Sequence, residues 1–181
     1  MTVDARPTGA GRTVSFEDAF QALYAARFPG LYRYLDRLTG DPDLATDVAQ
    51  EAFIRLHARG EMPDEPMGWL VTVANNLVRD EHRISGRRLQ ILAAQPQRVP
   101  LGAPADPAAD LERSERIGAV RAALDTLTER ERQALLLRHA GYSYREIAAA
   151  LGLADTSIGT TLVRAGQAFR AAYQELHGAP E

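Results

Sequence analysis

Two clusters of polar side chains have types and spacings that could recognise another molecule. The first is the segment DLATDVAQEAF, in which Asp47, Gln50 and Glu51 stand at positions i, i+3 and i+4. This spacing places them on one face of a helix, opposite an apolar stripe. The acidic face is either a solvated helix surface or a docking face for a basic partner surface.

An arginine row forms the second cluster. Between residues 79 and 98, five arginines stand against Asp80 and Glu81, a local charge of +3 in a chain of net charge −3. Four of these arginines follow one another at near-helical intervals: Arg79, Arg83, Arg87 and Arg88. Arginine side chains along one helical face can bind phosphate oxygens. Asn76, on the same predicted helix, can pair with exposed base edges. The row favours nucleic acid, with internal ion pairs to Asp80 as the alternative for its first part.

No pattern for catalysis or metal binding accompanies these clusters. The chain has no cysteine, and its four histidines are scattered without helical metal-ligand spacing. It contains no P-loop, no G-x-S-x-G and no H-E-x-x-H motif. We therefore expect neither an enzyme, nor a metal site, nor a cofactor.

Composition points to an ordinary globular protein. The chain has 181 residues, 45% of them hydrophobic and 25% charged, and every one of its 21 basic residues is arginine. The longest uncharged run, residues 66–78, is shorter than the ~20 residues of a membrane span, and residues 1–13 lack an apolar signal core. We expect no membrane insertion and a cytoplasmic location.

Helical signals divide the chain into two blocks that must position the polar clusters. Apolar residues recur at three- and four-residue intervals throughout residues 15–88, and Gly40-Asp41-Pro42 reads as a helix end followed by a capped helix start. The segment at residues 89–110 contains four prolines, which predicts a linker. Residues 1–14 and 178–181 read as tails.

The second block, residues 111–177, carries two capping boxes. Thr128 with Glu131, and Ser143 with Glu146, each predict a helix start, and Gly152 predicts the end of the second of these helices. A longer helix follows, so the layout is that of a helix-turn-helix. The predicted fold class is all-α: two small helical domains joined by a Pro/Ala-rich linker, the C-terminal one containing a helix-turn-helix.

These motifs resemble the extracytoplasmic-function (ECF) family of bacterial RNA polymerase sigma factors. DLATDVAQEAF resembles the family's D-x-x-Q-E-x-F helix, and the segment from Trp69 to Arg83 resembles its W-L-x-x-[IV]-A-x-N-x-x-x-D-x-x-R helix. LTERERQALLLR and YSYREIAAALG resemble its promoter −35 helix-turn-helix domain. The likeness covers residues 16–176. It implies a sigma region 2 domain at residues 15–88 and a sigma region 4 domain at residues 111–177.

The resemblance implies a transcription initiation factor that binds core RNA polymerase and directs recognition and opening of promoters at −10 and −35 elements. The expected partners are the β′ clamp helices and the β subunit of polymerase, promoter DNA and an anti-sigma factor. Residues matching the clamp-helix contacts are Asp47, Gln50 and Glu51; those matching the −10 contacts are Asn76, Arg79, Arg83, Arg87 and Arg88. The loop between Gly60 and Gly68 matches the segment that captures a flipped base.

The recognition helix departs from the family pattern G-T-V-K-S-R-L-x-R-A. Gly159 and Thr161 stand where basic residues are usual, so the helix from Asp155 to Leu176 carries no net charge. Candidate −35 contacts that remain are Thr156, Ser157, Thr160 and Arg164, and we expect a weak or unusual −35 preference. Two alternatives stay open: a stand-alone helix-turn-helix regulator that binds DNA as a homodimer, and a divergent sigma-like protein that acts through protein contacts.

Overall fold

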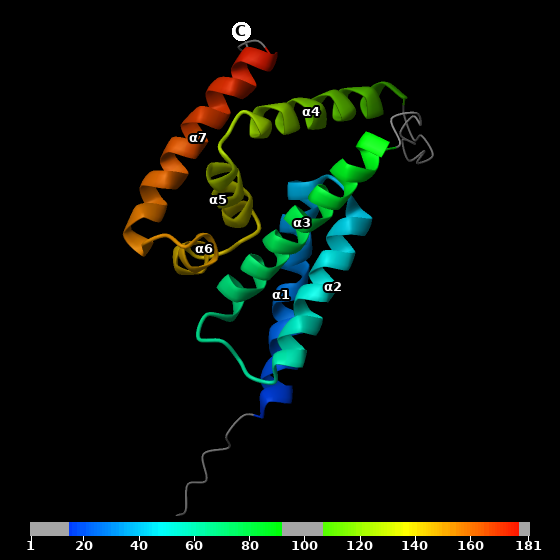
Figure 1. The fold of residues 1–181 in the computed structure, drawn as a ribbon. Coiled ribbons are helices and arrows are strands. Elements are labelled where there is room, and N and C mark those ends of the chain that lie inside the picture. The colour runs from blue at the N-terminus through cyan, green and yellow to red at the C-terminus, as the bar shows by residue number, and fades with distance from the viewer. Residues whose placement is uncertain (1–14, 92–106, 178–181) are drawn as a thin grey trace, which may run out of the picture.

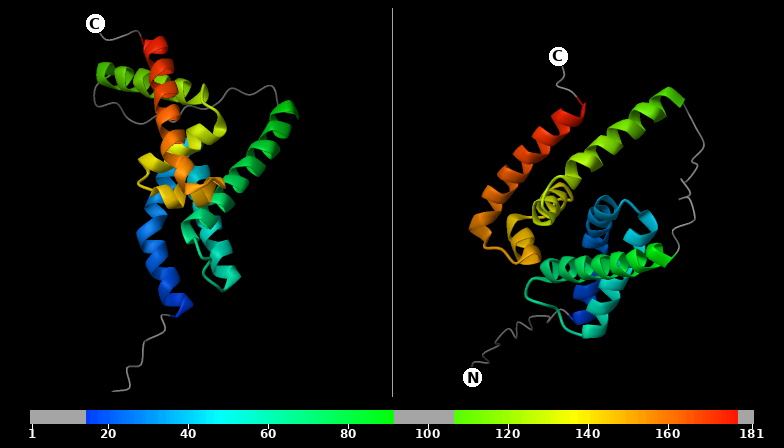
Figure 2. Two further views of the ribbon diagram at one scale, coloured as in Figure 1. Left: turned by 90° about the vertical axis from the view of Figure 1, so that its left-hand side faces the viewer. Right: turned by 45° about the horizontal axis from the view of Figure 1, so that its top comes forward.

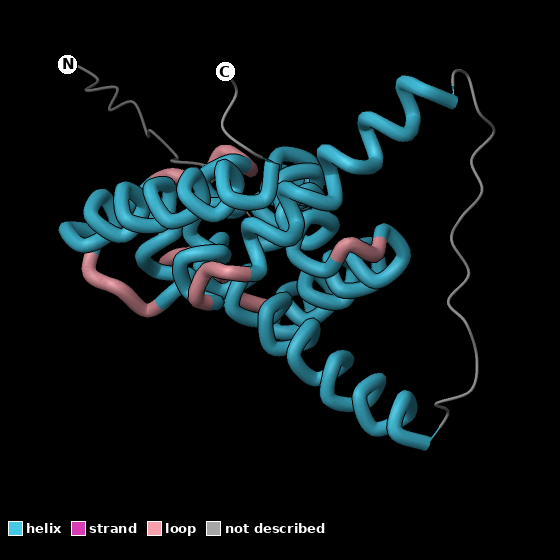
Figure 3. Tube along the Cα trace, turned by 90° about the horizontal axis from the view of Figure 1, so that it is seen from above, coloured by secondary structure: helices cyan, strands magenta, loops and turns pink. Residues whose placement is uncertain are grey.

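The computed structural model describes residues 15–91 and 107–177, and helices make up most of this part of the chain (Figures 1 and 3). The described residues form seven helices and no strand, which confirms the predicted all-α class. The helices are α1 (Phe16–Thr39), α2 (Pro42–Arg59), α3 (Pro66–Ile91), α4 (Pro107–Asp125), α5 (Glu129–His139), α6 (Tyr144–Leu151) and α7 (Asp155–His177).

Local signals set most of the helix boundaries. Helix α1 ends at Gly40, whose N–H donates to the Asp36 carbonyl at 2.8 Å. The Asp41 carboxylate then accepts the Asp43 and Leu44 N–H groups, at 3.0 and 3.1 Å, and starts α2. Both predicted capping boxes are present at the starts of α5 and α6. Helix α7 begins at Asp155.

The helices reach into both ends of the expected linker, residues 89–110. Helix α3 continues to Ile91, and α4 begins at Pro107. A proline is tolerated at this first helical position because the N–H that it lacks would have no partner within the helix. Residues 92–106 lie outside the described residues, as do both expected tails.

Helices α1, α2 and α3 form the first block, and α4 to α7 form the second (Figure 2). Buried side chains in the first block come from all three helices, among them Leu35, Phe53 and Leu70. In the second block α7 packs on α4, α5 and α6, with Ile147 and Ile158 fully buried where α6 meets α7. Each block therefore has apolar contacts of its own.

One core nevertheless runs through both blocks. Helix α6 packs against α3, and α5 packs against α1, so the buried cluster is continuous from Leu31 in α1 to Ile158 in α7. Periodicity within each block did not predict this packing, because it depends on contacts between residues far apart in sequence.

Candidate functional site

The predicted docking residues lie on the outer side of α2. Asp47 and Gln50 are exposed, and the Glu51 side chain is 43% exposed, whereas Val48, Ala52 and Leu56 on the opposite side are buried. The Arg55 Nε donates to the Glu51 carboxylate at 2.8 Å, one helical turn along. An exposed pair of this kind contributes little stability, so Glu51 can exchange Arg55 for another cation.

These three residues border two different surfaces. Asp47 and Glu51 line a shallow acidic groove between α2 and α3, together with Glu81. Gln50 borders an apolar groove between α1 and α2, whose other lining residues are Phe20, Tyr24, Phe53, Ile54, His57 and Ala58. Ile54 is 61% exposed. The sequence analysis missed this aromatic groove; exposed apolar side chains on the outer side of α2 were the signal that could have found it.

A buried hydrogen bond fixes the orientation of α3. Tyr34 of α1 is fully buried, and its hydroxyl donates to the Asn75 Oδ1 at 2.8 Å. Burial raises the pKa of Tyr34 well above its ordinary value, so the hydroxyl stays a donor. Since Asn75 faces the core, the next residue, Asn76, faces outward and is exposed. The sequence analysis singled out Asn76 and did not anticipate the structural role of its neighbour.

The described arginines of α3 are exposed and partly paired. The Arg79 Nη1 donates to the Asn76 Oδ1 at 2.9 Å, and its Nε lies 3.4 Å from the Glu129 carboxylate of α5. Arg83 lies 3.3 Å from the Asp80 carboxylate, one of the internal pairs considered from the sequence. Both arginine side chains are more than half exposed. Arg87 and Arg88 lie within α3, but their side chains are outside the described part of the structure.

The loop between Gly60 and Gly68 contacts the second block at its C-terminal end. Met62 and Pro63 are half-buried, and the Glu65 carboxylate pairs with Arg145 of α6. Gly68 itself is buried against Ala149 of the same helix.

Helices α6 and α7 form the predicted helix-turn-helix. Gly152 ends α6 with φ of +63°, a conformation that residues with a Cβ rarely adopt, and this turn directs the chain into α7. On α7 the exposed stripe contains Thr156, Thr160 and Arg164, at spacings of four residues. The Ser157 hydroxyl instead donates to the Ala154 carbonyl at 2.7 Å, within its own turn.

The two departures from the family pattern have different surroundings. The Thr161 hydroxyl donates to the Ser157 carbonyl of its own helix at 2.9 Å. A Cβ added at Gly159 would lie 3.9 Å from Cε2 of Tyr144, which is ordinary van der Waals contact. Packing therefore does not require glycine here. Tyr144 is 47% exposed, and the Arg138 guanidinium lies over its ring, 5.4 Å from the centroid.

No cluster of three or more potential metal ligands occurs in the part of the chain that the structure describes. None of the helices within residues 15–91 and 107–177 is long and apolar enough to span a membrane.

Comparison with known proteins gives matches along both blocks. Residues 23–88 match the family model described as Sigma-70 region 2, and residues 117–168 match Sigma-70 region 4. The chain is 33% identical over 170 residues to the ECF RNA polymerase sigma factor SigL of Mycobacterium tuberculosis, covering 86% of this chain and 89% of SigL. It is 33% identical over 152 residues to EcfG of Rhodopseudomonas palustris, covering 82% and 81% of the two chains.

Two solved structures share the fold. One is the sigma factor RpoE in complex with the anti-sigma factor NepR from Bartonella quintana, with a TM-score of 0.60, 25% identity and coverage of 90% of this chain and 99% of RpoE. The other is CnrH in complex with the cytosolic domain of CnrY, with a TM-score of 0.58, 25% identity and coverage of 88% and 90%.

Proposed function

The chain belongs to the ECF family of RNA polymerase sigma factors, and from this premise we propose how its surfaces divide the work of transcription initiation. The exposed side of α2 docks on core RNA polymerase, α3 and the loop before it bind the −10 element, and α6 with α7 binds the −35 element. The chain itself performs no chemical step in this role. It acts in the cytoplasm, where bacterial polymerase and chromosome are found.

The docking proposal depends on one observation: α2 is packed against α1 and α3 on one side, and its other side exposes acidic and amide side chains to solvent. Asp47, Gln50 and Glu51 point away from the buried stripe of α2, which holds the helix rigidly against α1 and α3. Rigid presentation favours binding because little conformational entropy is lost when the partner docks. The neighbouring groove around Ile54 adds apolar area that a polymerase helix can cover.

Promoter opening is assigned to the outward face of α3. Asn76 and Arg83 are exposed there and offer an amide for a base edge and a guanidinium for phosphate. Arg79 belongs to the same face, and Arg87 and Arg88 continue the row toward the end of the helix. The similar structure of the sigma factor RpoE is a complex with the anti-sigma factor NepR, which supports the proposal that an anti-sigma factor controls this chain as well.

Charge reversal on α2 tests the docking proposal. We expect Asp47→Arg and Glu51→Arg each to abolish binding to core polymerase while leaving the helix content unchanged, because each places a cation against a basic partner surface. Glu175→Arg is the matched control, since it makes the same charge change at an exposed position of α7. Core binding by pull-down and helix content by circular dichroism are measured together. Normal core affinity in both α2 variants would refute the docking assignment.

Truncation on α3 tests the opening assignment separately. Asn76→Ala and Arg83→Ala are expected to keep wild-type affinity for core polymerase and to lose open-complex formation, measured by permanganate reactivity of unpaired thymines. Undiminished opening in both variants would count against the assignment.

A further inference from the structure

A cleft lies where α3 passes α5 and α6. Its volume is about 360 Å³, within the range of about 300–1,000 Å³ that is typical of small-molecule sites. Ala150 and Leu151 of α6 give it one apolar wall, and the rest of its lining carries amide, hydroxyl, guanidinium and carboxylate groups. This cleft therefore suits a polar ligand that makes several hydrogen bonds.

Two buried amide side chains face each other across this cleft from α3 and α5. Asn75 and Gln133 are each only 6% exposed, and both line the cleft. The Asn75 Oδ1 accepts the Tyr34 hydroxyl, so the amide nitrogen of Asn75 is the group left to donate to a ligand. The Gln133 Nε2 donates to the Glu129 Oε1 at 3.0 Å, which leaves the Gln133 Oε1 to accept. The cleft thus offers a fixed donor together with a fixed acceptor.

A second cleft of about 210 Å³ adjoins the first, because Asn75, Gln133 and Arg79 line both. Its own lining includes Arg132 of α5 and His82 of α3. Cationic and donating groups are therefore concentrated in the second cleft, whereas the amides are concentrated in the first.

The charge of the lining favours an anion. Three arginines, Arg79, Arg130 and Arg132, stand against the single carboxylate of Glu129 in the two clefts taken together, a net charge of +2. Arginine side chains present a fork of donors that fits phosphate oxygens.

Arg132 contains a buried donor that the fold does not use. Its Nη1 donates to the Asp125 carboxylate at 2.9 Å, whereas its Nε is buried and has no hydrogen-bond partner among the described residues. Buried donors without partners are rare in folded proteins because each one costs free energy. A ligand that brings an anionic oxygen to this atom recovers that cost.

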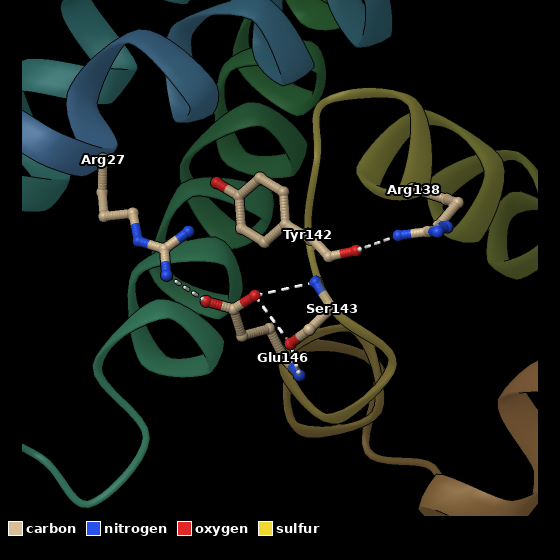
Figure 4. Close-up of polar contacts among 5 residues, drawn as sticks. All are labelled: Arg27, Arg138, Tyr142, Ser143 and Glu146. Atoms are coloured by element: carbon tan, nitrogen blue, oxygen red, sulfur yellow. Dashed lines mark hydrogen bonds and ion pairs between the residues drawn. The ribbon is translucent and has the colours of Figure 1, made fainter.

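Helix α1 holds both walls of the clefts in place. The Tyr34 hydroxyl of α1 fixes Asn75 on the α3 wall. On the other side, the Arg27 guanidinium of α1 lies 2.9 Å from the Glu146 carboxylate, which also accepts the N–H and hydroxyl of Ser143 at the start of α6 (Figure 4). Because both walls are anchored to one helix, a ligand meets groups that are already positioned.

We propose that the two clefts together bind a free mononucleotide, with its base against Asn75 and Gln133 and its phosphate against Arg132 and Arg79. Base edges present hydrogen-bond donors and acceptors side by side, which matches the donor and acceptor of the two amides. The proposal goes beyond the proposed function, which uses none of Asn75, Gln133 and Arg132.

Calorimetric titration of the purified full chain measures this binding without polymerase or DNA. The probes are the four ribonucleoside monophosphates, with ribose 5-phosphate as the probe that lacks a base and the parent nucleosides as probes that lack a phosphate. We expect at least one mononucleotide to bind with a dissociation constant below about 1 mM. Its nucleoside and ribose 5-phosphate should each bind about tenfold more weakly, because each loses the contacts of one cleft.

Two variants separate recognition of the base from recognition of the phosphate. Gln133→Met keeps a long side chain but removes the acceptor, so the ratio of mononucleotide affinity to ribose 5-phosphate affinity should fall about tenfold. Arg132→Lys keeps a cation beside Asp125 but removes the Nε, so both affinities should fall about fivefold and their ratio should stay the same. A merely structural role of either residue would not produce these two different patterns.

Matched controls make the same chemical changes elsewhere. Gln167→Met and Arg170→Lys alter exposed side chains of α7 that line neither cleft, and both should bind like wild type. Circular dichroism checks that each variant keeps its helix content. Asn76 and Arg79 are left unchanged because they are assigned to the −10 element.

Three results would overturn the proposal: no mononucleotide binds below about 1 mM, ribose 5-phosphate binds as tightly as every mononucleotide, or both cleft variants bind like wild type. Tighter binding of a single-stranded hexanucleotide than of any mononucleotide would also overturn it, and would assign the clefts to DNA. Since the titration uses the free chain, its outcome is independent of whether the chain initiates transcription.

Discussion

The hydrogen bond between Tyr34 and Asn75 offers a test of what holds α3 in position. Tyr34→Phe removes only the hydroxyl and leaves the Asn75 Oδ1, at a residue that is 6% exposed, without its donor. Leaving a buried acceptor unpaired costs about 1–3 kcal/mol. The free energy of unfolding of a small domain is about 5–15 kcal/mol, so this loss is a substantial part of it.

Tyr142→Phe is the matched control. The Tyr142 hydroxyl is also buried, but it has no hydrogen-bond partner among the described residues. Removing it deletes a buried polar group that gains nothing from the fold, so the free energy of unfolding should stay the same or rise. The same chemical change thus has opposite expected effects at two buried tyrosines.

Urea unfolding measures both effects. Trp69, the only tryptophan, is half-buried in α3 and reports on the first block by fluorescence, while circular dichroism reports on all helices. We expect Tyr34→Phe to lower the unfolding midpoint with an unchanged slope. If Tyr34→Phe unfolds like wild type, or if Tyr142→Phe costs as much, the assignment of the Tyr34–Asn75 bond as the anchor of α3 is wrong.

Two further predictions follow from the recognition helix and from the buried tyrosines. The space beside Tyr144 accommodates Gly159→Arg, which should tighten binding to duplex DNA about tenfold at low salt and steepen the slope of log K against log salt concentration by about one. The control Gly118→Arg should change neither the affinity nor the slope. Equal effects of the two variants would contradict the prediction. Burial raises the pKa of Tyr34 and Tyr142, so the folded state keeps protons that the unfolded chain loses above pH ~10. Below pH ~10 the two tyrosines should have no effect on how the free energy of unfolding depends on pH. Above it, the free energy of unfolding should fall by about 1.4 kcal/mol per pH unit for each tyrosine. The double variant Tyr34→Phe/Tyr142→Phe should not show this fall.

Features set by neighbouring residues were predictable from the sequence. The end of α1 and the start of α2 follow from Gly40-Asp41-Pro42, and both capping boxes formed as expected. The helical phase also placed Asp47 and Gln50 on the outer side of α2. These features depend on contacts within four residues, which a single sequence displays directly.

Features set by distant residues were not predictable in this way. Tyr34 and Asn75 are separated by 41 positions, and nothing in either segment alone identifies the other. The fit of Gly68 against Ala149 similarly joins helices from the two blocks. Local periodicity indicated two helical blocks, and their closure into one core required the positions of α3 and α6 in space.

Transcription by bacterial core polymerase supplemented with the purified chain tests the central claim most directly. The template is a fragmented genomic library from the source organism, and transcript starts are mapped by sequencing. A sigma factor should produce discrete starts that share sequences near −10 and −35, and none of these starts should appear with core polymerase alone. Failure of the chain to bind core polymerase, combined with binding to palindromic DNA as a homodimer, would contradict the account and establish a stand-alone regulator instead.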